Sequence, residues 1–174
     1  QMTKHQELFI ELLNYMHERT SAIIGAKFSP DSTDKDILEF SKLLKGFPKS
    51  YMNLGNTSFK KCEDVDLPPY AISIGGGGLS GPALYPRTLE MTRLIASKGI
   101  PIIATGGIDS ADKVKELLDN GASLVGMATA VVKDMYCIPK INQELSKMKS
   151  LNGSNWYKIK TNYYCLLFKI FIIV

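Results

Sequence analysis

The chain contains 174 residues, of which 21 are basic and 17 are acidic, so its formal net charge is +4. Hydrophobic residues make up 45% of the sequence and charged residues 22%, which is the composition of a folded globular domain. This composition excludes a disordered or collagen-like chain. The basic residues are spread along the sequence without a cluster, which argues against a nucleic-acid partner.

The chain has three widely separated cysteines and two histidines: Cys62, Cys137, Cys165, His5 and His17. No CxxC pair occurs, so the sequence predicts neither a disulfide framework nor a metal site, and reduced thiols indicate a cytoplasmic protein. The N-terminal residues do not match a signal peptide. The longest apolar run, residues 163–174, is interrupted by Lys169 and is shorter than the about 20 residues that a membrane-spanning helix needs.

The hydrophobic pattern predicts helices and strands in alternation. Apolar residues three and four apart indicate helices, and short apolar runs are typical of strands buried on both faces of a parallel sheet. Capping residues, glycine and proline mark the helix ends. In chain order we expect a helix to Met16, a strand at 22–28, a helix between Asp31 and Gly46, a strand at 51–54, a loop at 58–70, a short strand at 71–74, a glycine-rich loop at 75–78, a helix at 88–97, a strand at 100–104, a helix ending at Asn120, a strand at 122–128 and a helix at 138–148.

About four strand–helix units follow from this order. Such units form parallel sheets, either as an open doubly wound sheet or as an α/β barrel. Four units are half of an eightfold barrel, and the chain is shorter than the roughly 200–250 residues of a complete one. The composition changes after Ser150, so we expect one domain at 1–150 and an irregular tail at 151–174.

Glycine-bearing segments directly follow the last two predicted strands, at 105–108 and 126–129. Glycine lets a phosphate approach the backbone closely, and N–H groups at a helix start point toward it. In barrels, the loops after the last two strands commonly build a phosphate site. The sequence therefore favours a phosphate site here over glycines that only form tight turns. The glycine run at 75–81 is by itself more typical of a flexible loop, but it precedes a helix and is a candidate third set of donors.

A lysine and an amide follow two earlier strands. Lys27 lies at the end of one predicted strand, and Asn56 and Thr57 follow the next. A lysine there is ordinarily solvated, but it also suits the stabilisation of negative charge on a ring in a barrel mouth. Asparagine offers a donor and an acceptor to a planar carbonyl-amide edge, yet Asn-Thr also caps turns. The residues alone leave both interpretations open.

Three motifs together resemble the C-terminal half of dihydroorotate dehydrogenases: residues 77–82, 100–110 and 121–125. Residues 51–57 resemble the Asn-rich strand of the class 1 enzymes, at the family spacing from the lysine of Ala26-Lys27-Phe28. The resemblance runs from about Phe9 to Met148. It implies a TIM (β/α)8 barrel, here only its C-terminal half, that holds FMN and oxidises dihydroorotate to orotate in pyrimidine biosynthesis.

The resemblance also implies roles for individual residues. Lys27 would contact the pyrimidine ring of the flavin and stabilise its negative charge, while Asn56 and Thr57 would bind the orotate ring. The flavin would lie beside Gly55, and its phosphate would be held by Gly81, Gly106, Gly107, Ala128 and Thr129.

The catalytic base of the family, a Cys or Ser, lies upstream of the lysine strand, and neither Cys62 nor Ser80 stands at its position. We therefore expect a fragment without dehydrogenase activity of its own. The class 1 resemblance favours a soluble electron acceptor such as fumarate and a homodimer when complete. The alternatives are another FMN barrel acting on pyrimidines, similar to dihydropyrimidine dehydrogenase, and a non-catalytic remnant.

Overall fold

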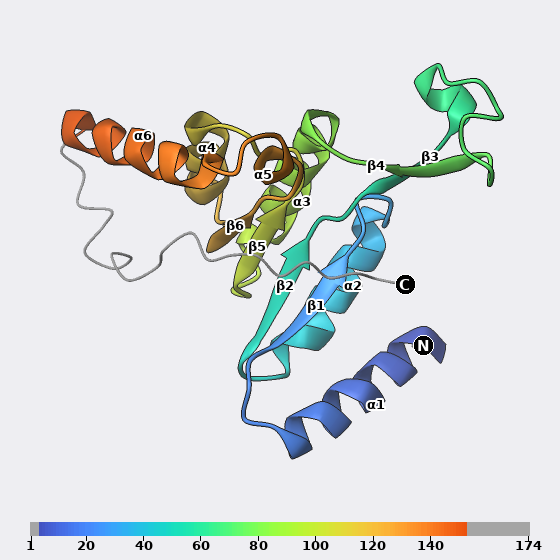
Figure 1. The fold of residues 1–174 in the computed structure, drawn as a ribbon. Helices are drawn as coiled ribbons and strands as arrows, with labels where there is room; N and C mark the ends of the chain where they lie inside the picture. The colour runs from blue at the N-terminus through green and yellow to red at the C-terminus, as the bar shows by residue number, and fades with distance from the viewer. Residues whose placement is uncertain (1–3, 153–174) are drawn as a thin grey trace.

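The computed structural model describes residues 4–152, which form alternating helices and strands (Figure 1). Their bounds in chain order are α1 Lys4–Arg19, β1 Ile24–Phe28, α2 Asp34–Lys45, β2 Ser50–Leu54, β3 Ser58–Lys61, the 3-10 helix η1 Cys62–Val65, β4 Gly76–Leu79, the 3-10 helix η2 Pro82–Leu84, α3 Tyr85–Ala96, β5 Ile102–Thr105, α4 Ala111–Asp119, β6 Leu124–Gly126, α5 Thr129–Lys133 and α6 Cys137–Asn152.

Four strands form a parallel sheet in the order β1-β2-β5-β6. Lys27 is level with Asn53 on the neighbouring strand, Asn53 with Ile103, and Ile103 with Leu124. Because all four strands run in the same direction, their carboxyl ends meet at one edge of the sheet. The expected class is confirmed, since the strands of this parallel sheet stand in chain order, as they do in an α/β barrel.

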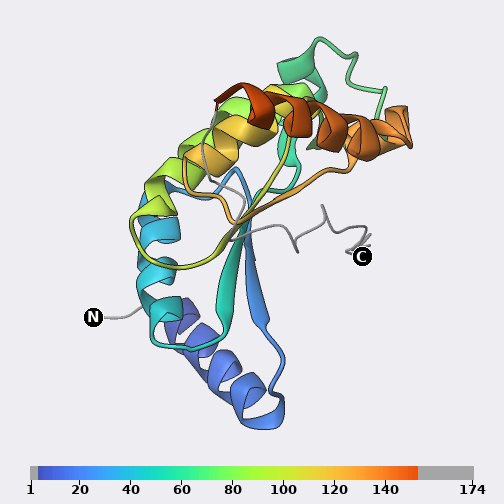
Figure 2. The ribbon, with the colours of Figure 1, turned by 90° about the vertical axis from the view of Figure 1, so that its left-hand side faces the viewer.

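Helices cover one face of this sheet. Figure 2 shows α2 and α3 on one side of β1 and β2. Alternate strand residues point toward these helices and are at most 9% exposed; they are Ile24, Phe28, Met52, Leu54, Ile102 and Ala104. They form two clusters with apolar side chains of the helices. Burial of one such large side chain stabilises the fold by about 1.5–3 kcal/mol.

The other face of the sheet is open within residues 4–152. The strand residues in between are exposed or half-buried; they are Gly25, Lys27, Tyr51, Asn53, Ile103, Thr105, Leu124 and Gly126. Parallel sheets are ordinarily covered on both faces. The apolar run at 22–28 was expected to be buried on both faces, and in the described part of the chain β1 is covered on one.

Residues 58–79 differ from the expectation. The predicted loop at 58–70 begins with β3, and the predicted glycine loop is mostly β4, which pairs with β3 in an antiparallel hairpin. The predicted strand at 71–74 is a turn. Glycine makes the pairing fit, because a Cβ on Gly76 would lie 2.5 Å from the carbonyl oxygen of Lys60. Cys62, within the predicted loop at 58–70, begins η1 and is only 2% exposed.

The C-terminal boundaries also shift. The last predicted strand is shorter than expected, because β6 ends at Gly126 and the five-residue helix α5 follows. Helix α6 extends to Asn152, past the expected domain boundary at 150. The tail expected at 151–174 lies, from 153 onward, outside the described residues.

Thr33 caps α2, and its replacement by alanine is expected to lower the free energy of unfolding by about 1 kcal/mol. Its Oγ1 accepts a hydrogen bond from the Asp36 N–H at 3.1 Å and donates one to the Asp36 carboxylate at 2.7 Å. Urea unfolding followed by circular dichroism measures the loss. Thr33→Ser keeps the hydroxyl and is the control; an equal loss in both variants would contradict the cap.

Candidate functional site

The residues singled out by the sequence gather at the carboxyl edge of the parallel sheet. Lys27 is the penultimate residue of β1, and the turn 55–57 follows β2. Gly106 and Gly107 follow β5, and residues 128–129 follow β6. The edge therefore brings together segments that are up to about a hundred residues apart in the chain.

Lys27 and Asn56 are in direct contact at this edge. The Nζ of Lys27 donates to the Oδ1 of Asn56 at 3.4 Å. Lys27 is exposed on the open face of the sheet, so its charge is directed to that face and not into the core. With its oxygen beside the lysine, the Asn56 amide keeps its NH2 group to donate to a ligand.

Two polar strand residues extend this arrangement and were not singled out by the sequence analysis. The Oγ1 of Thr105 donates to the Oδ1 of Asn53 at 3.0 Å, which joins β5 to β2 across the open face. Asn53 is level with Lys27. The signal in the sequence was a polar residue inside an otherwise apolar strand, which is costly unless its hydrogen bonds are satisfied.

Glycines let the strand ends approach closely around Thr105. Gly55 has φ of 132°, and a Cβ built on it would overlap the carbonyl oxygen of Thr105. A Cβ on Gly126 would lie 2.6 Å from the Oγ1 of the same threonine. Thr105 therefore lies close against the backbone at the ends of both β2 and β6.

Gly106 and Gly107 let α3 lie against the end of β5. Both have positive φ, of 128° and 72°. A Cβ on Gly106 would lie 2.8 Å from the hydroxyl of Thr88, and one on Gly107 would lie 2.5 Å from the backbone nitrogen of Tyr85. Glycine is required here by the packing of the protein itself.

Three backbone N–H groups at this edge are candidate donors to an anion such as a phosphate. Within residues 4–152, the N–H groups of Gly106, Gly107 and Thr129 donate to no backbone carbonyl. Ser80 and Gly81 lie against the start of α5, where the Oγ1 of Thr129 donates to the Oγ of Ser80 at 3.2 Å. The first two of these N–H groups follow the end of β5 and the third begins α5, and such unpaired N–H groups are the donors that phosphate sites use.

Polar side chains of α3 and α4 form hydrogen bonds next to the turn at Gly106 and Gly107. The Nζ of Lys113 donates to the Gly107 carbonyl at 3.2 Å and to Asp109 at 2.8 Å. The Tyr85 hydroxyl donates to the Glu116 carboxylate at 2.7 Å. Burial, followed by this bond, raises the pKa of Tyr85 well above its ordinary value. The Tyr85 phenol therefore stays protonated, and its role is structural.

Two open surface depressions, of about 520 and 640 Å3, run along α1 and the turn before β2, away from the strand-end edge. In the described part of the chain, no three His, Cys, Asp or Glu side chains are grouped as a metal site requires. The same residues include no helix long and apolar enough to cross a membrane.

Comparison with known proteins assigns the sequence to a family. The sequence model of dihydroorotate dehydrogenase matches residues 1–148. The catalytic subunit of dihydroorotate dehydrogenase B (NAD(+)) from Streptococcus pneumoniae serotype 4 is 30% identical over 148 residues, which are 84% of this chain and 47% of that protein. The subunit of the same name from Geobacillus sp. is 30% identical over 169 residues, or 91% of this chain and 53% of that protein. The chain thus spans about half the length of these relatives.

A solved structure shows the same fold. The dihydroorotate dehydrogenase of Eimeria tenella, in complex with ferulenol, superposes with a TM-score of 0.64 at 21% identity and covers 75% of this chain and 35% of that one. The partial α/β barrel, the glycine-bearing strand ends and the match over residues 1–148 lead to one assignment: the chain belongs to the dihydroorotate dehydrogenase family.

Proposed function

We propose that this chain supplies the C-terminal half of the active site of an FMN-dependent dihydroorotate dehydrogenase, which oxidises dihydroorotate to orotate in pyrimidine biosynthesis. The observation that carries the proposal is the contact between Lys27 and Asn56 on the open face of the sheet, beside unpaired backbone donors. A cation and an amide at one edge suit a charged, planar ring.

The flavin would contact the strand-end edge in two places. Gly81, Gly106, Gly107, Ala128 and Thr129 would hold the phosphate through backbone donors and the Thr129 hydroxyl. Lys27 would lie against the flavin ring, with Gly55 beside it because this position has no side chain. When bound, FMN supplies the hydride acceptor of the reaction.

The substrate would lie over the turn that follows β2. Asn56 and Thr57 present an amide and a hydroxyl, and Asn53 adds a second amide, already oriented by Thr105. Such groups match the alternating carbonyl and N–H edge of a pyrimidine ring. The Lys27 ammonium, whose Nζ is 3.4 Å from the Oδ1 of Asn56, would stabilise negative charge on a bound ring.

The electron acceptor that we propose is NAD(+), in place of the fumarate expected from the sequence. The relatives from Streptococcus pneumoniae and Geobacillus sp. are both named for NAD(+) and as catalytic subunits. A further subunit that delivers electrons to NAD(+) fits such a name. Homodimerisation of the complete enzyme remains part of the proposal.

The test is a chimera in which residues 1–148 of this chain replace the matched part of the Streptococcus pneumoniae subunit. We expect the chimera to bind FMN, seen as flavin absorbance, and to reduce a dye with dihydroorotate. Lys27→Ala should lower the rate about 100-fold, the size of effect seen when one donor to developing charge is removed. The control is Lys42→Ala, at an exposed position on α2.

The alternative is a non-catalytic remnant. In that case the chimera would fold, as circular dichroism would show, but would retain no FMN. Equal rates in the Lys27 and Lys42 variants would instead contradict the role of Lys27. Thr129→Val removes the hydroxyl proposed to hold the phosphate, so it should weaken FMN retention by the chimera. A change at Gly107 is a less direct test, because a side chain there would collide with Tyr85.

A further inference from the structure

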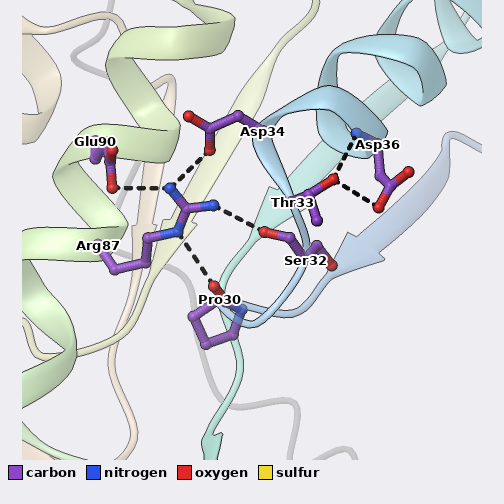
Figure 3. Close-up of polar contacts among 7 residues, drawn as sticks. All are labelled: Pro30, Ser32, Thr33, Asp34, Asp36, Arg87 and Glu90. Atoms are coloured by element: carbon purple, nitrogen blue, oxygen red, sulfur yellow. Dashed lines mark hydrogen bonds and ion pairs between the residues drawn. The ribbon is translucent and has the colours of Figure 1, made fainter.

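Arg87 of α3 holds the turn that follows β1 (Figure 3). Its Nε donates to the Pro30 carbonyl at 3.1 Å, and its Nη2 donates to the Ser32 carbonyl at 2.8 Å. Its Nη1 pairs with the carboxylates of Asp34 at 2.7 Å and Glu90 at 2.8 Å. Because the guanidinium is rigid and planar, these bonds fix the turn in position and in orientation relative to α3.

The Arg87 side chain is 24% exposed. Burial, the largest single influence, lowers the pKa of Arg87, but hydrogen bonds and charges from Glu90 and Asp34 outweigh it and raise the pKa. The charge is therefore permanent, and two carboxylates balance it. Removal of the guanidinium would leave two carbonyls and two carboxylates without their shared donor.

The turn held by Arg87 contains Asp31, which binds the chain just after the predicted substrate turn. The Asp31 carboxylate accepts from the Ser58 hydroxyl at 2.5 Å and from the Phe59 N–H at 2.9 Å. Ser58 is 7% exposed and directly follows Thr57. The Ser58 bond, opposed by burial and helped by Phe59 and the charge of Lys60, lowers the pKa of Asp31.

The bonds of Arg87 and Asp31 link the segment that follows Lys27 to the segment that follows Asn56. Lys27 lies just before the turn that Arg87 holds, and Asn56 lies two residues before Ser58, which Asp31 binds. We propose that Asp31, held in place by Arg87, is a positioning residue that fixes Asn56 against Lys27. The positioning is a property of the chain itself; its importance for orotate recognition rests on the proposed function.

The bonds of Asp31 to β3 also affect the predicted phosphate site. Asp31 binds the first two residues of β3, and β3 pairs with β4, with Ser58 level with Leu79. Ser80 and Gly81 follow β4 directly and lie against Thr129. A displacement of β3 would therefore move both the substrate turn and one side of the phosphate site.

The experiment is NMR spectroscopy of the 15N-labelled 174-residue chain and its Asp31→Asn variant. On acidification below about 3.9, the ordinary pKa of an aspartate, the Asn56 side-chain amide and the Phe59 N–H should shift together in one step. The sign follows from the lowered pKa: the bonds are intact above that pH and are lost as the pH falls through the pKa of the folded protein.

In Asp31→Asn the acid step should disappear, and hydrogen exchange at Phe59 should become about 10-fold faster or more, because a charge-assisted bond is lost. Arg87→Lys keeps the positive charge but loses the planar guanidinium that binds several acceptors at once. Although residue 87 does not contact β3, this variant should speed hydrogen exchange at the Phe59 N–H. The control is Asp119→Asn on α4, whose carboxylate pairs with Lys115. It should leave both signals unchanged.

An acid step confined to Phe59, with Asn56 unmoved, would overturn the positioning role, and this result is available from the original chain even if Asp31→Asn does not fold. Unchanged exchange at Phe59 in Arg87→Lys would overturn the part assigned to Arg87. No FMN or dihydroorotate is present in these measurements. Their failure is therefore distinct from failure of the chimera to bind FMN.

Discussion

Replacement of Gly55 by alanine is expected to lower the free energy of unfolding by more than about 4 kcal/mol, which is exceptional for one methyl group. Two costs combine. The φ of 132° is strained for a residue with a side chain, and the new Cβ would overlap the carbonyl oxygen of Thr105 and lie 2.6 Å from its carbonyl carbon. Thr105 belongs to an inner strand, so its backbone has no room to move aside.

Gly99→Ala separates the two costs. Gly99 also has positive φ, of 74°, but a Cβ there would meet nothing within 4 Å. We expect about 1–2 kcal/mol from the backbone strain by itself. Urea unfolding followed by circular dichroism compares the two variants. Similar losses in both would show that β2 and β5 separate easily, and the close strand ends would then not be needed for stability.

The sequence was sufficient for the parallel sheet because its strands and helices are defined locally. The runs that became β1, β2 and β5 are mostly apolar and are bounded by proline, glycine or capping residues. Thr33, for example, directly precedes α2 and caps it. Each helix and strand of the sheet is therefore determined largely by its own residues and their immediate neighbours.

The hairpin of β3 and β4 was missed because it depends on contacts distant in the sequence. Three of the four residues of β4 are glycines, which carry no alternation of polar and apolar side chains. The strand forms because β3 offers a partner and because Asp31, 27 residues from Ser58, fixes where β3 begins. Neither fact is visible in a local pattern.

The candidate site, too, was predicted only in part from the sequence. The strand-end positions of Lys27 and Asn56 followed from the alternation of strands and helices, and their contact at 3.4 Å agrees with it. The bond from Thr105 to Asn53 and the bonds of Arg87 did not follow, because they join residues 52 to 57 positions apart. Only the folded chain brings these residues together.

The 174-residue chain by itself is expected to oxidise dihydroorotate at least about 10⁴-fold more slowly than a full-length relative. A positioned base contributes about 10²–10⁴-fold, and stabilisation of developing charge about 10²–10³-fold. The second contribution depends on a site from which water is excluded. Here Lys27 lies on a sheet face that the described part of the chain leaves open, so water screens its charge.

The measurement is dye reduction by dihydroorotate with added FMN, at equal protein concentration, with the Streptococcus pneumoniae subunit as reference. That subunit matches this chain over 47% of its length, so more than half of its residues have no counterpart here. The chimera that supplies those residues should recover flavin absorbance and turnover, since they would cover the open face beside Lys27. Comparable turnover by the 174 residues themselves would mean that the exposed face already holds the flavin and that a base lies within this chain.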